Sequence, residues 1–258
     1  MSGKADRPFG IILAAGRGSR MGAMTDTQPK CLTQLAGKTL LQWQLSALQA
    51  AGVVDLCIVR GYQKQAIQAD GVWYRDNPHW ASSTMLRSLL CVQDLLASDE
   101  TVVCYSDIVF HPGHVRSLLA TGGDIRITYD ISWKELWTRR FEFPLDDAET
   151  FVLSEGLLLE IGGKSADIDS IQGQYMGLTA ITPQGWRQIQ ETLAHLTKSE
   201  QDRLDMTALF SLLLDNGVGI TAVPVDGKWC EVDTEKDIAV YTKQLMTCRV
   251  WKHDWRWD

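Results

Sequence analysis

Short apolar runs alternate with amphipathic stretches through the first half of the chain. The apolar runs have the length of buried strands and cover residues 9–16, 55–60, 72–75 and 101–105. The spacing of apolar residues between these runs predicts helices at 39–51, 63–69 and 82–96, the last with a serine as its N-cap. Strands that alternate with helices imply a parallel sheet with right-handed crossovers. The fold class is therefore α/β, with a Rossmann-like, mostly parallel mixed sheet flanked by helices.

The pattern changes after about residue 123, where strands follow one another more closely. Two apolar runs, 151–153 and 157–161, flank Ser154-Glu155-Gly156, a spacing typical of a hairpin. Further strands are expected at 123–130, 175–181, 218–225 and 229–232. Helices are expected at 183–195, 205–216 and 234–245. The second half thus adds an antiparallel or mixed region to the same domain, which we expect to span residues 1–248.

Charge is distributed unevenly along the chain. The formal net charge is −7, which argues against nucleic acid as a partner. Residues 1–38, however, contain six basic and two acidic residues, and the first glutamate of the chain is Glu100. A cationic N-terminal segment on an acidic protein indicates an anionic ligand, although chance placement would give the same charges.

Composition excludes several classes of protein. No apolar run approaches about 18 residues, so we expect no membrane span. The N-terminus also lacks the basic and apolar regions of a signal peptide. The six cysteines are scattered without a C-x-x-C pair, which argues against a zinc site or a disulfide framework. We therefore expect a cytoplasmic location.

A glycine-rich loop, Gly16-Arg17-Gly18-Ser19-Arg20-Met21-Gly22, follows the first predicted strand. The dinucleotide fingerprint does not fit, because Met21 stands where that motif has its third glycine. The phosphate loop of kinases does not fit either, since both Gly-Lys-[Ser/Thr] triplets lack the required upstream glycine. A loop for a mononucleotide triphosphate remains, with backbone N–H groups facing phosphate oxygens and cations neutralising them.

The segment Leu13 to Met21, L-A-A-G-R-G-S-R-M, followed by Pro29-Lys30, resembles the nucleotidyltransferase family, whose members include nucleoside-diphosphate-sugar pyrophosphorylases. The resemblance implies a nucleotide-binding half at 9–122 and an acceptor and metal half at 123–233. It implies Lys30 and Arg17 as catalytic residues. The nucleotide-binding residues that it implies are Leu13, Ala14, Ala15, Gly16, Gly18, Ser19, Arg20, Asn77, Ser82, Ser83, Thr84 and Ser106. A serine at 82–84 could equally be an ordinary helix cap.

Two aspartates are the candidate metal ligands. Asp107 follows the strand at 101–105, at the edge where α/β sheets hold ligands, and Asp233 lies in a stretch that resembles the family's second metal motif. Carboxylates are hard oxygen ligands for Mg²⁺, which neutralises charge during nucleotidyl transfer. Each aspartate alone could instead cap a loop or helix. We expect Glu231 not to be a ligand and Asp237 to face solvent or the helix dipole.

The second half indicates the acceptor. The segments P-L-D-D-A-E and G-Q-Y-M-G-L resemble a branch that contains bacterial phosphocholine and 2-aminoethylphosphonate cytidylyltransferases. The resemblance implies CTP as a substrate and a small zwitterionic phosphate or phosphonate as the acceptor. Candidate groups are cations for the anionic end, aromatic rings for cation–π contact and carboxylates for the ammonium: Arg139, Arg140, Trp133, Trp137, Tyr129, Tyr175, Asp146, Asp147 and Glu149. Both aromatic and acidic residues are present, so the sequence does not choose between the two acceptors.

The expected reaction is in-line attack of the acceptor oxyanion on the α-phosphorus, with release of pyrophosphate. Alternatives that remain open are a sugar-1-phosphate nucleotidyltransferase, a metal-dependent glycosyltransferase and a non-catalytic nucleotide-binding regulator. The last ten residues, 249–258, form a tail with three tryptophans. Docking of the tail onto its own domain or onto a second copy would remove these rings from water, so a homo-oligomer also stays open.

Overall fold

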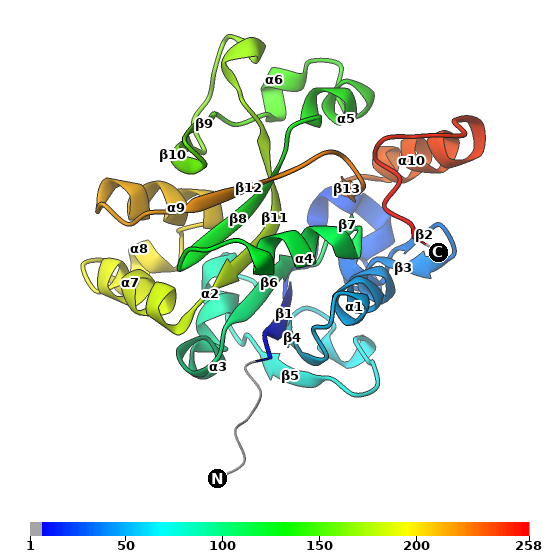
Figure 1. Cartoon of the computed structure of the whole chain (residues 1–258). Coiled ribbons are helices and arrows are strands. Elements are labelled where there is room, and N and C mark those ends of the chain that lie inside the picture. Colours follow the sequence, from blue (N-terminus) through cyan, green and yellow to red (C-terminus); the bar gives the residue numbers. More distant parts are fainter. Residues whose placement is uncertain (1–6, 258) are drawn as a thin grey trace.

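The computed structural model describes residues 7–257, in which nine strands form one mixed sheet (Figure 1). The order across the sheet is β5-β4-β1-β6-β11-β8-β12-β10-β9. Its strands are β1 (Phe9–Ala14), β4 (Asp55–Arg60), β5 (Trp73–Asp76), β6 (Thr101–Tyr105), β8 (Ile125–Asp130), β9 (Phe151–Ser154), β10 (Leu157–Ile161), β11 (Gln174–Ile181) and β12 (Thr221–Val225). Lys4, one of the basic residues of the N-terminal segment, and Asp258, the last residue of the tail, lie outside the described residues.

The first four strands in the sheet order, β5, β4, β1 and β6, run parallel, as the alternation of strands and helices predicts. β11 then runs antiparallel to both β6 and β8, and the hairpin β9–β10 closes the far edge. The predicted α/β fold with a mixed second half is confirmed. The two halves of the chain meet in the middle of the sheet, where β6 pairs with β11.

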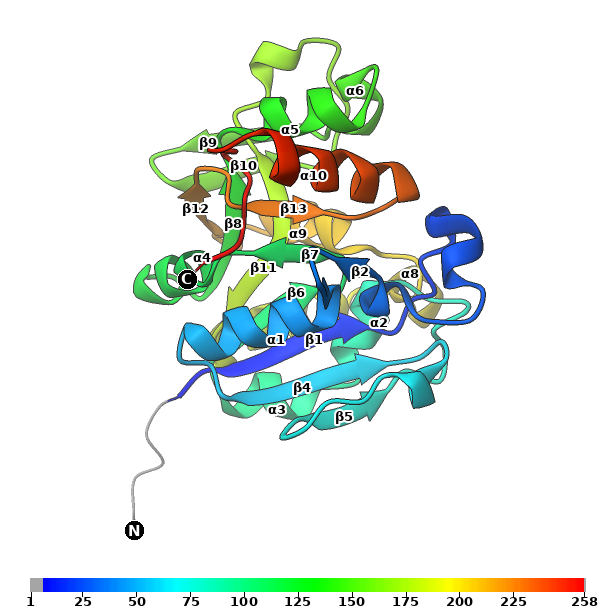
Figure 2. The same cartoon turned by 90° about the vertical axis from the view of Figure 1, so that its right-hand side faces the viewer.

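Helices cover both faces of the sheet (Figures 1 and 2). The α-helices are α1 (Leu40–Ala50), α2 (Met85–Leu90), α3 (Gln93–Ser98), α4 (Pro112–Ala120), α5 (Trp133–Arg140), α6 (Pro144–Asp147), α7 (Pro183–Leu193), α8 (Lys198–Gln201), α9 (Met206–Asp215) and α10 (Glu235–Thr247). α1 and α4 pack together on one face, while α2, α3, α7 and α9 contact one another on the other. α1 begins with a capping box, in which the side chains of Thr39 and Gln42 each accept a hydrogen bond from the other's backbone N–H.

Two small ribbons lie outside the large sheet. β2 (Gln34–Leu35) and β3 (Lys38–Thr39) form one, and β7 (Ile108–Phe110) and β13 (Trp229–Glu231) form the other. The second ribbon joins the segment after β6 to the segment before α10. Four short 3₁₀ segments complete the fold: η1 (Ser19–Thr25), η2 (Lys30–Leu32), η3 (Lys64–Ala66) and η4 (Ile168–Ser170).

The helix expected at 82–96 is interrupted in the structure. It divides at Cys91-Val92 into α2, which packs on β1 and β4, and α3, which packs on α7. A straight helix could not place its apolar residues against both partners. The expected serine cap is also wrong, because Thr84 is the N-cap residue and its hydroxyl donates to the Leu204 carbonyl instead of capping.

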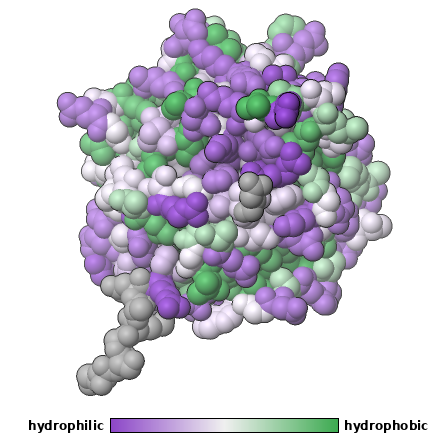
Figure 3. Space-filling model, turned by 45° about the vertical axis from the view of Figure 1, so that its right-hand side comes forward, coloured by the Kyte–Doolittle hydropathy of each residue, from purple (hydrophilic) through white to green (hydrophobic). Residues whose placement is uncertain are grey.

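The tryptophan-rich tail packs against its own domain. Trp251 and Trp255 are buried, and Trp255 meets Trp43 of α1 edge-on, with 6.0 Å between ring centroids. Burial in the same chain removes these rings from water, so no second copy is needed to cover them. On the face shown in Figure 3, hydrophobic residues form separate patches among hydrophilic ones. Among the described residues, no helix is long and apolar enough to cross a membrane.

Candidate active site

Three carboxylates meet at the ribbon formed by β7 and β13. Asp107 precedes β7, Glu231 ends β13 and Asp233 lies two residues further on. The ribbon register pairs Glu231 with Ile108, and Val232 N donates to the Asp107 carbonyl over 2.9 Å. One oxygen from each carboxylate lies within 4.8 Å of the others. The ribbon therefore brings together residues that are more than 120 positions apart in the sequence.

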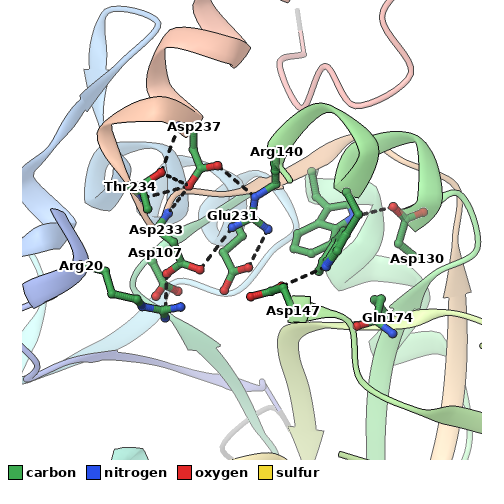
Figure 4. A network of polar contacts seen from close by, with 12 residues as sticks. Arg20, Asp107, Asp130, Arg140, Asp147, Gln174, Glu231, Asp233, Thr234 and Asp237 are labelled. Carbon is green, nitrogen blue, oxygen red and sulfur yellow. Dashed lines mark hydrogen bonds and ion pairs between the residues drawn. The ribbon is translucent and has the colours of Figure 1, made fainter. Parts of the chain in front are cut away.

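Lys30 and Arg20 contact this acidic cluster, and Figure 4 shows Arg20 beside it. Lys30 Nζ lies 2.9 Å from Asp107 Oδ2 and 2.7 Å from Asp233 Oδ1, and Arg20 Nη2 lies 2.9 Å from Asp233 Oδ1. Burial lowers the pKa of Lys30, but the charges of Asp107 and Asp233 outweigh that effect and the net pKa is raised. Lys30 therefore carries its charge at neutral pH. Both cations were predicted from the glycine-loop and Pro-Lys motifs to act near the reacting phosphates.

Arg140 pairs with the carboxylates of the cluster from the protein interior. Its side chain is fully buried, and its guanidinium reaches Glu231 at 2.9 Å, Asp233 at 3.2 Å and Asp237 at 3.1 Å (Figure 4). The prediction that Arg140 binds the acceptor directly is therefore wrong, because all of its donors face carboxylates in the protein interior. Of the two positions expected for Asp237, the one facing solvent is wrong, and the one at the helix dipole agrees with its place in the first turn of α10. Asp237 is buried and caps α10 by accepting from the N–H groups of Asp233 and Thr234.

The three carboxylates fit a divalent cation. Asp107 Oδ1 is buried and has no hydrogen-bond partner within the described residues, so one ligand oxygen is free of competing contacts. Carboxylate oxygens are the ligands that Mg²⁺ prefers. Burial and the charge of Asp233 raise the pKa of Glu231 to about 7, against the lowering effect of Arg140. The expectation that Glu231 stands apart is corrected, since Glu231 and Asp233 are two residues apart on an extended segment and face the same way.

The glycine-rich loop supports Lys30. Gly18 has φ 76°, and a Cβ built there would lie 2.6 Å from Lys30 Cβ. Glycine is therefore required both for the backbone conformation and for the close approach of the Lys30 stem. Arg17 turns to Asp26 and to the Tyr62 ring, with which it makes a cation–π contact, and does not contact the acidic cluster. The structure thus places Lys30, but not Arg17, at the carboxylates.

Replacing Gly18 with alanine should lower the free energy of unfolding by about 1–2 kcal/mol, because alanine is strained at this φ and its methyl group displaces Lys30. Gly16→Ala is the matched control, since nothing lies within 4 Å of a Cβ at that position. Urea denaturation of the two variants measures the difference. Equal stability of Gly18→Ala and the wild type would contradict this account of the loop.

A cavity of about 290 Å³ opens beside the loop, on the side where the sequence predicts the nucleotide. It is lined by Leu13, Ala15, Gly16, Asn77, Trp80, Ser83, Thr84, Met85, Ser88 and Asp205. Six of these were predicted. Trp80 was missed although it lies between the predicted residues Asn77 and Ser82, because a loop tryptophan is more often a packing residue. Ser82, Ala14, Ser19 and Ser106 are not among the lining residues of this cavity.

A second cavity, of about 280 Å³, lies at the acidic cluster; we call it the acceptor cavity because residues predicted to bind the acceptor line it. Arg20, Glu231 and Asp233 line one end of it. Four predicted acceptor residues also line it, namely Trp137, Asp147, Glu149 and Tyr175, together with residues that were not predicted, such as Phe151 and Gln174. Trp137 Nε1 donates to Asp147 Oδ2 over 2.9 Å, which fixes that carboxylate at the wall. Met85 and Asp205 line both cavities, so the two adjoin.

The other predicted acceptor residues do not line this cavity. Trp133 is buried and packs edge-on against Trp137. Tyr129 is stacked on Phe151, and Arg139 pairs with Glu135 on the exposed side of α5. Asp146 contributes its carbonyl, not its carboxylate, to a contact with Lys164. These residues shape or surround the wall, and the sequence could not separate them from those that face the cavity.

Glu149 lies where the acceptor cavity meets a larger one, of about 730 Å³. Burial raises the pKa of Glu149, and the nearby charge of Asp205 raises it further, against the lowering effect of Lys164. A positive group entering this corner would stabilise the ionised carboxylate. The position of Glu149 thus favours a cationic ligand where the two cavities meet.

Comparison with known proteins agrees with this arrangement. Residues 10–135 match the model of the MobA-like NTP transferase domain. The chain is 29% identical over 249 residues to CTP:phosphoglutamine cytidylyltransferase of Campylobacter jejuni, covering 89% of this chain and 97% of that one. The chain therefore contains a MobA-like NTP transferase domain. The predicted resemblance to the nucleotidyltransferase family and to its bacterial cytidylyltransferases is confirmed.

Two further comparisons show over how much of the chain the similarity in sequence and in fold extends. A 2-aminoethylphosphonate cytidylyltransferase of Lancefieldella rimae is 29% identical over 43% of this chain, and the match spans about half (47%) of that relative's length. The solved structure of the inositol-1-phosphate CTP transferase from T. maritima superposes with a TM-score of 0.73 at 16% identity, covering 92% of this chain and 96% of that one. The structural match shows that the nucleotidyltransferase fold extends over nearly the whole chain.

Proposed function

We propose that the protein is a cytidylyltransferase, which transfers the cytidylyl group of CTP to the oxyanion of a small phosphorylated or phosphono acceptor bearing an ammonium group, and releases pyrophosphate. The observation that carries the proposal is the position of the acidic cluster. Carboxylates that fit a divalent cation, with Lys30 on them, line a cavity walled by aromatic rings and carboxylates, and that cavity adjoins another beside the glycine loop. Relatives that act on CTP support the choice of nucleotide.

Lys30 and Arg20 supply the positive charge for the reaction. Both lie at the acidic cluster, and their charged groups would bind the phosphate oxygens of the nucleotide as it enters. The acceptor oxygen then forms a bond to the α-phosphorus, and the bond from that phosphorus to the β-phosphate oxygen breaks in line. The acceptor is already ionised near neutral pH, so no general base is needed. Positioning and charge stabilisation supply most of the rate.

Asp107, Glu231 and Asp233 would hold the divalent cation, for which we propose Mg²⁺. When bound, the ion neutralises charge on the phosphate oxygens and acts as a Lewis acid. Arg140 keeps Glu231 and Asp233 in place while Lys30 engages the nucleotide. Arg140 thus pairs with the carboxylates from the protein interior, while Arg20 lines the cavity.

The acceptor cavity supports an ammonium-bearing substrate. Asp147, Glu149 and Asp205 give this cavity a negative wall, and the rings of Trp137, Phe151 and Tyr175 lie beside them. By name, two relatives of this chain act on phosphoglutamine and 2-aminoethylphosphonate. Each of these acceptors combines a phosphorus oxyanion with an amino group. Carboxylates with hydrogen bonds favour such a primary ammonium, while a quaternary one relies on the aromatic rings.

Pyrophosphate release with CTP and a panel of acceptors tests the proposal. We expect turnover with phosphoglutamine, 2-aminoethylphosphonate or phosphocholine, and none with glucose-1-phosphate. Glu149→Gln should raise the KM of an amine-bearing acceptor about tenfold and leave the KM of CTP unchanged, because a charge-assisted hydrogen bond contributes about 1.5–3 kcal/mol.

Glu155→Gln is the control for that variant, since Glu155 lies exposed in the turn between β9 and β10. Activity with glucose-1-phosphate alone would reject the proposed acceptor class. Equal KM values for the amine-bearing acceptor in Glu149→Gln and Glu155→Gln would reject the role of Glu149.

A further inference from the structure

We propose that the C-terminal segment 251–255 is a positioning element for the metal-binding carboxylates, and that His253 is its central residue. The inference rests on the proposed function, since it assigns a role toward the divalent cation held by Asp107, Glu231 and Asp233. His253 does not contact the acidic cluster directly. The influence of His253 on the carboxylates passes through Asp130 and through the ribbon formed by β7 and β13.

Asp130, at the end of β8, is a fully buried carboxylate with four hydrogen-bond partners. Its Oδ2 accepts from Trp229 Nε1 and from His253 Nε2, each over 2.9 Å. Its Oδ1 accepts from the backbone N–H groups of Ser132 and Gly227, over 2.8 and 3.0 Å. One carboxylate thus joins the tail, the start of β13, the turn before it and the start of α5.

The tail also runs along the backbone of the ribbon, as the red trace beside β13 shows in Figure 2. Lys228 N donates to the Lys252 carbonyl over 2.8 Å, and Cys230 Sγ lies 3.5 Å from the His253 carbonyl. A Cβ on Gly227 would lie 2.4 Å from the Lys252 carbonyl oxygen, so the two backbones approach as closely as glycine allows. These contacts hold the first residues of β13 against the tail.

The far end of the same strand carries the metal ligands. β13 continues from Trp229 to Glu231, and its pairing with β7 fixes the position of Asp107. Tyr241 of α10 donates to the Glu231 carbonyl over 2.6 Å, and the Trp251 ring packs on Tyr241 with 5.7 Å between ring centroids. His253 of the tail therefore contacts the first residues of β13. Trp251 of the tail packs on Tyr241, whose hydroxyl group holds the other end of β13 at Glu231.

This arrangement is more than a source of stability because metal affinity depends on ligand geometry. Groups that orient metal ligands from outside the coordination shell typically change metal affinity by about 10- to 100-fold when they are removed. A shift of β13 along β7 would change the spacing of Glu231 and Asp233 relative to Asp107. The tail, acting through Asp130 and Trp229, opposes that shift.

Titration calorimetry of the full chain with Mn²⁺ tests the inference, well below the melting temperature of every variant. His253→Leu should weaken Mn²⁺ binding by about 10- to 100-fold. His253→Gln, whose amide nitrogen can still donate to Asp130, should restore affinity to within about threefold. Arg256→Ala is the control, because Arg256 is an exposed tail residue that pairs only with Asp254 among its ion pairs in the described chain.

Trp229→Phe provides a second variant if His253→Leu does not fold, since it removes one hydrogen bond to Asp130 and retains an aromatic ring. We expect weaker Mn²⁺ binding here as well. Folded variants with lower melting temperatures but wild-type Mn²⁺ affinity would overturn the inference and leave the proposed function intact. A wild-type chain that binds no Mn²⁺ would instead overturn the proposed function together with the inference.

Discussion

Replacing Lys30 with methionine should lower kcat/KM for CTP about 10²- to 10³-fold, which is the usual effect of removing one group that stabilises charge in the transition state. Lys30 is the buried cation that contacts both Asp107 and Asp233. Methionine keeps the length of the stem that packs on Gly18, so the change removes charge more than volume. Steady-state pyrophosphate release at saturating acceptor measures the effect.

Lys38→Met is the matched control for this experiment. Lys38 belongs to the same cationic segment, but it is exposed and its ammonium lies over the Trp43 ring, 4.5 Å from the centroid. We expect near-wild-type turnover from it. If Lys30→Met turned over as fast as Lys38→Met, Lys30 could not be the cation that serves the transferred phosphate. A melting curve of each variant separates lost chemistry from lost structure.

Arg140→Met should lower the free energy of unfolding by about 3–5 kcal/mol, because it leaves buried carboxylates without their common counter-ion. The Arg140 side chain is fully buried and pairs with Glu231, Asp233 and Asp237. Turnover should fall as well, even for the fraction that remains folded, since two of these partners are candidate metal ligands. Urea denaturation measures the first effect, and steady-state kinetics on the folded protein measures the second.

Arg139→Met is the natural comparison, because it removes the same charge one residue earlier. Arg139 is exposed and pairs with Glu135 across one turn of α5, a contact that contributes about 0.3–0.5 kcal/mol. We expect little change in stability or turnover. Equal losses in Arg139→Met and Arg140→Met would show that the buried cluster contributes no more than a surface ion pair.

Local pattern was sufficient for most elements of the fold. The strands at 55–60 and 101–105 were predicted with the boundaries that the structure shows, because each is an apolar run bounded by polar residues or glycine. The last helix was also predicted, since Thr234 gives it a clear N-cap. The helix at 82–96 was not, because its interruption at Cys91-Val92 reflects two packing partners that lie elsewhere in the chain.

The residues of the candidate site also fall into those that local motifs identified and those whose role depended on tertiary contacts. Lys30, Asp107 and Asp233 were chosen from motifs, and the structure brings these three together. Arg139 and Arg140 were given one role because adjacent arginines are equivalent in a sequence. Their burial differs completely, and burial depends on which side of α5 meets the rest of the protein. Glu231 had a local signal, its place two residues before Asp233 on an extended segment, which alone could have identified it.

The sequence by itself determined the order of strands and helices, the glycine loop and two of the three carboxylates of the acidic cluster, Asp107 and Asp233, because each of these depends on short-range pattern and residue chemistry. Only the tertiary structure decided which cation neutralises the carboxylates from the interior, which aromatic residues wall the acceptor cavity, and where the tryptophan-rich tail packs. Those outcomes depend on contacts between distant segments. His253 and Asp130, 123 residues apart, form one such contact, and no pattern along the chain relates them.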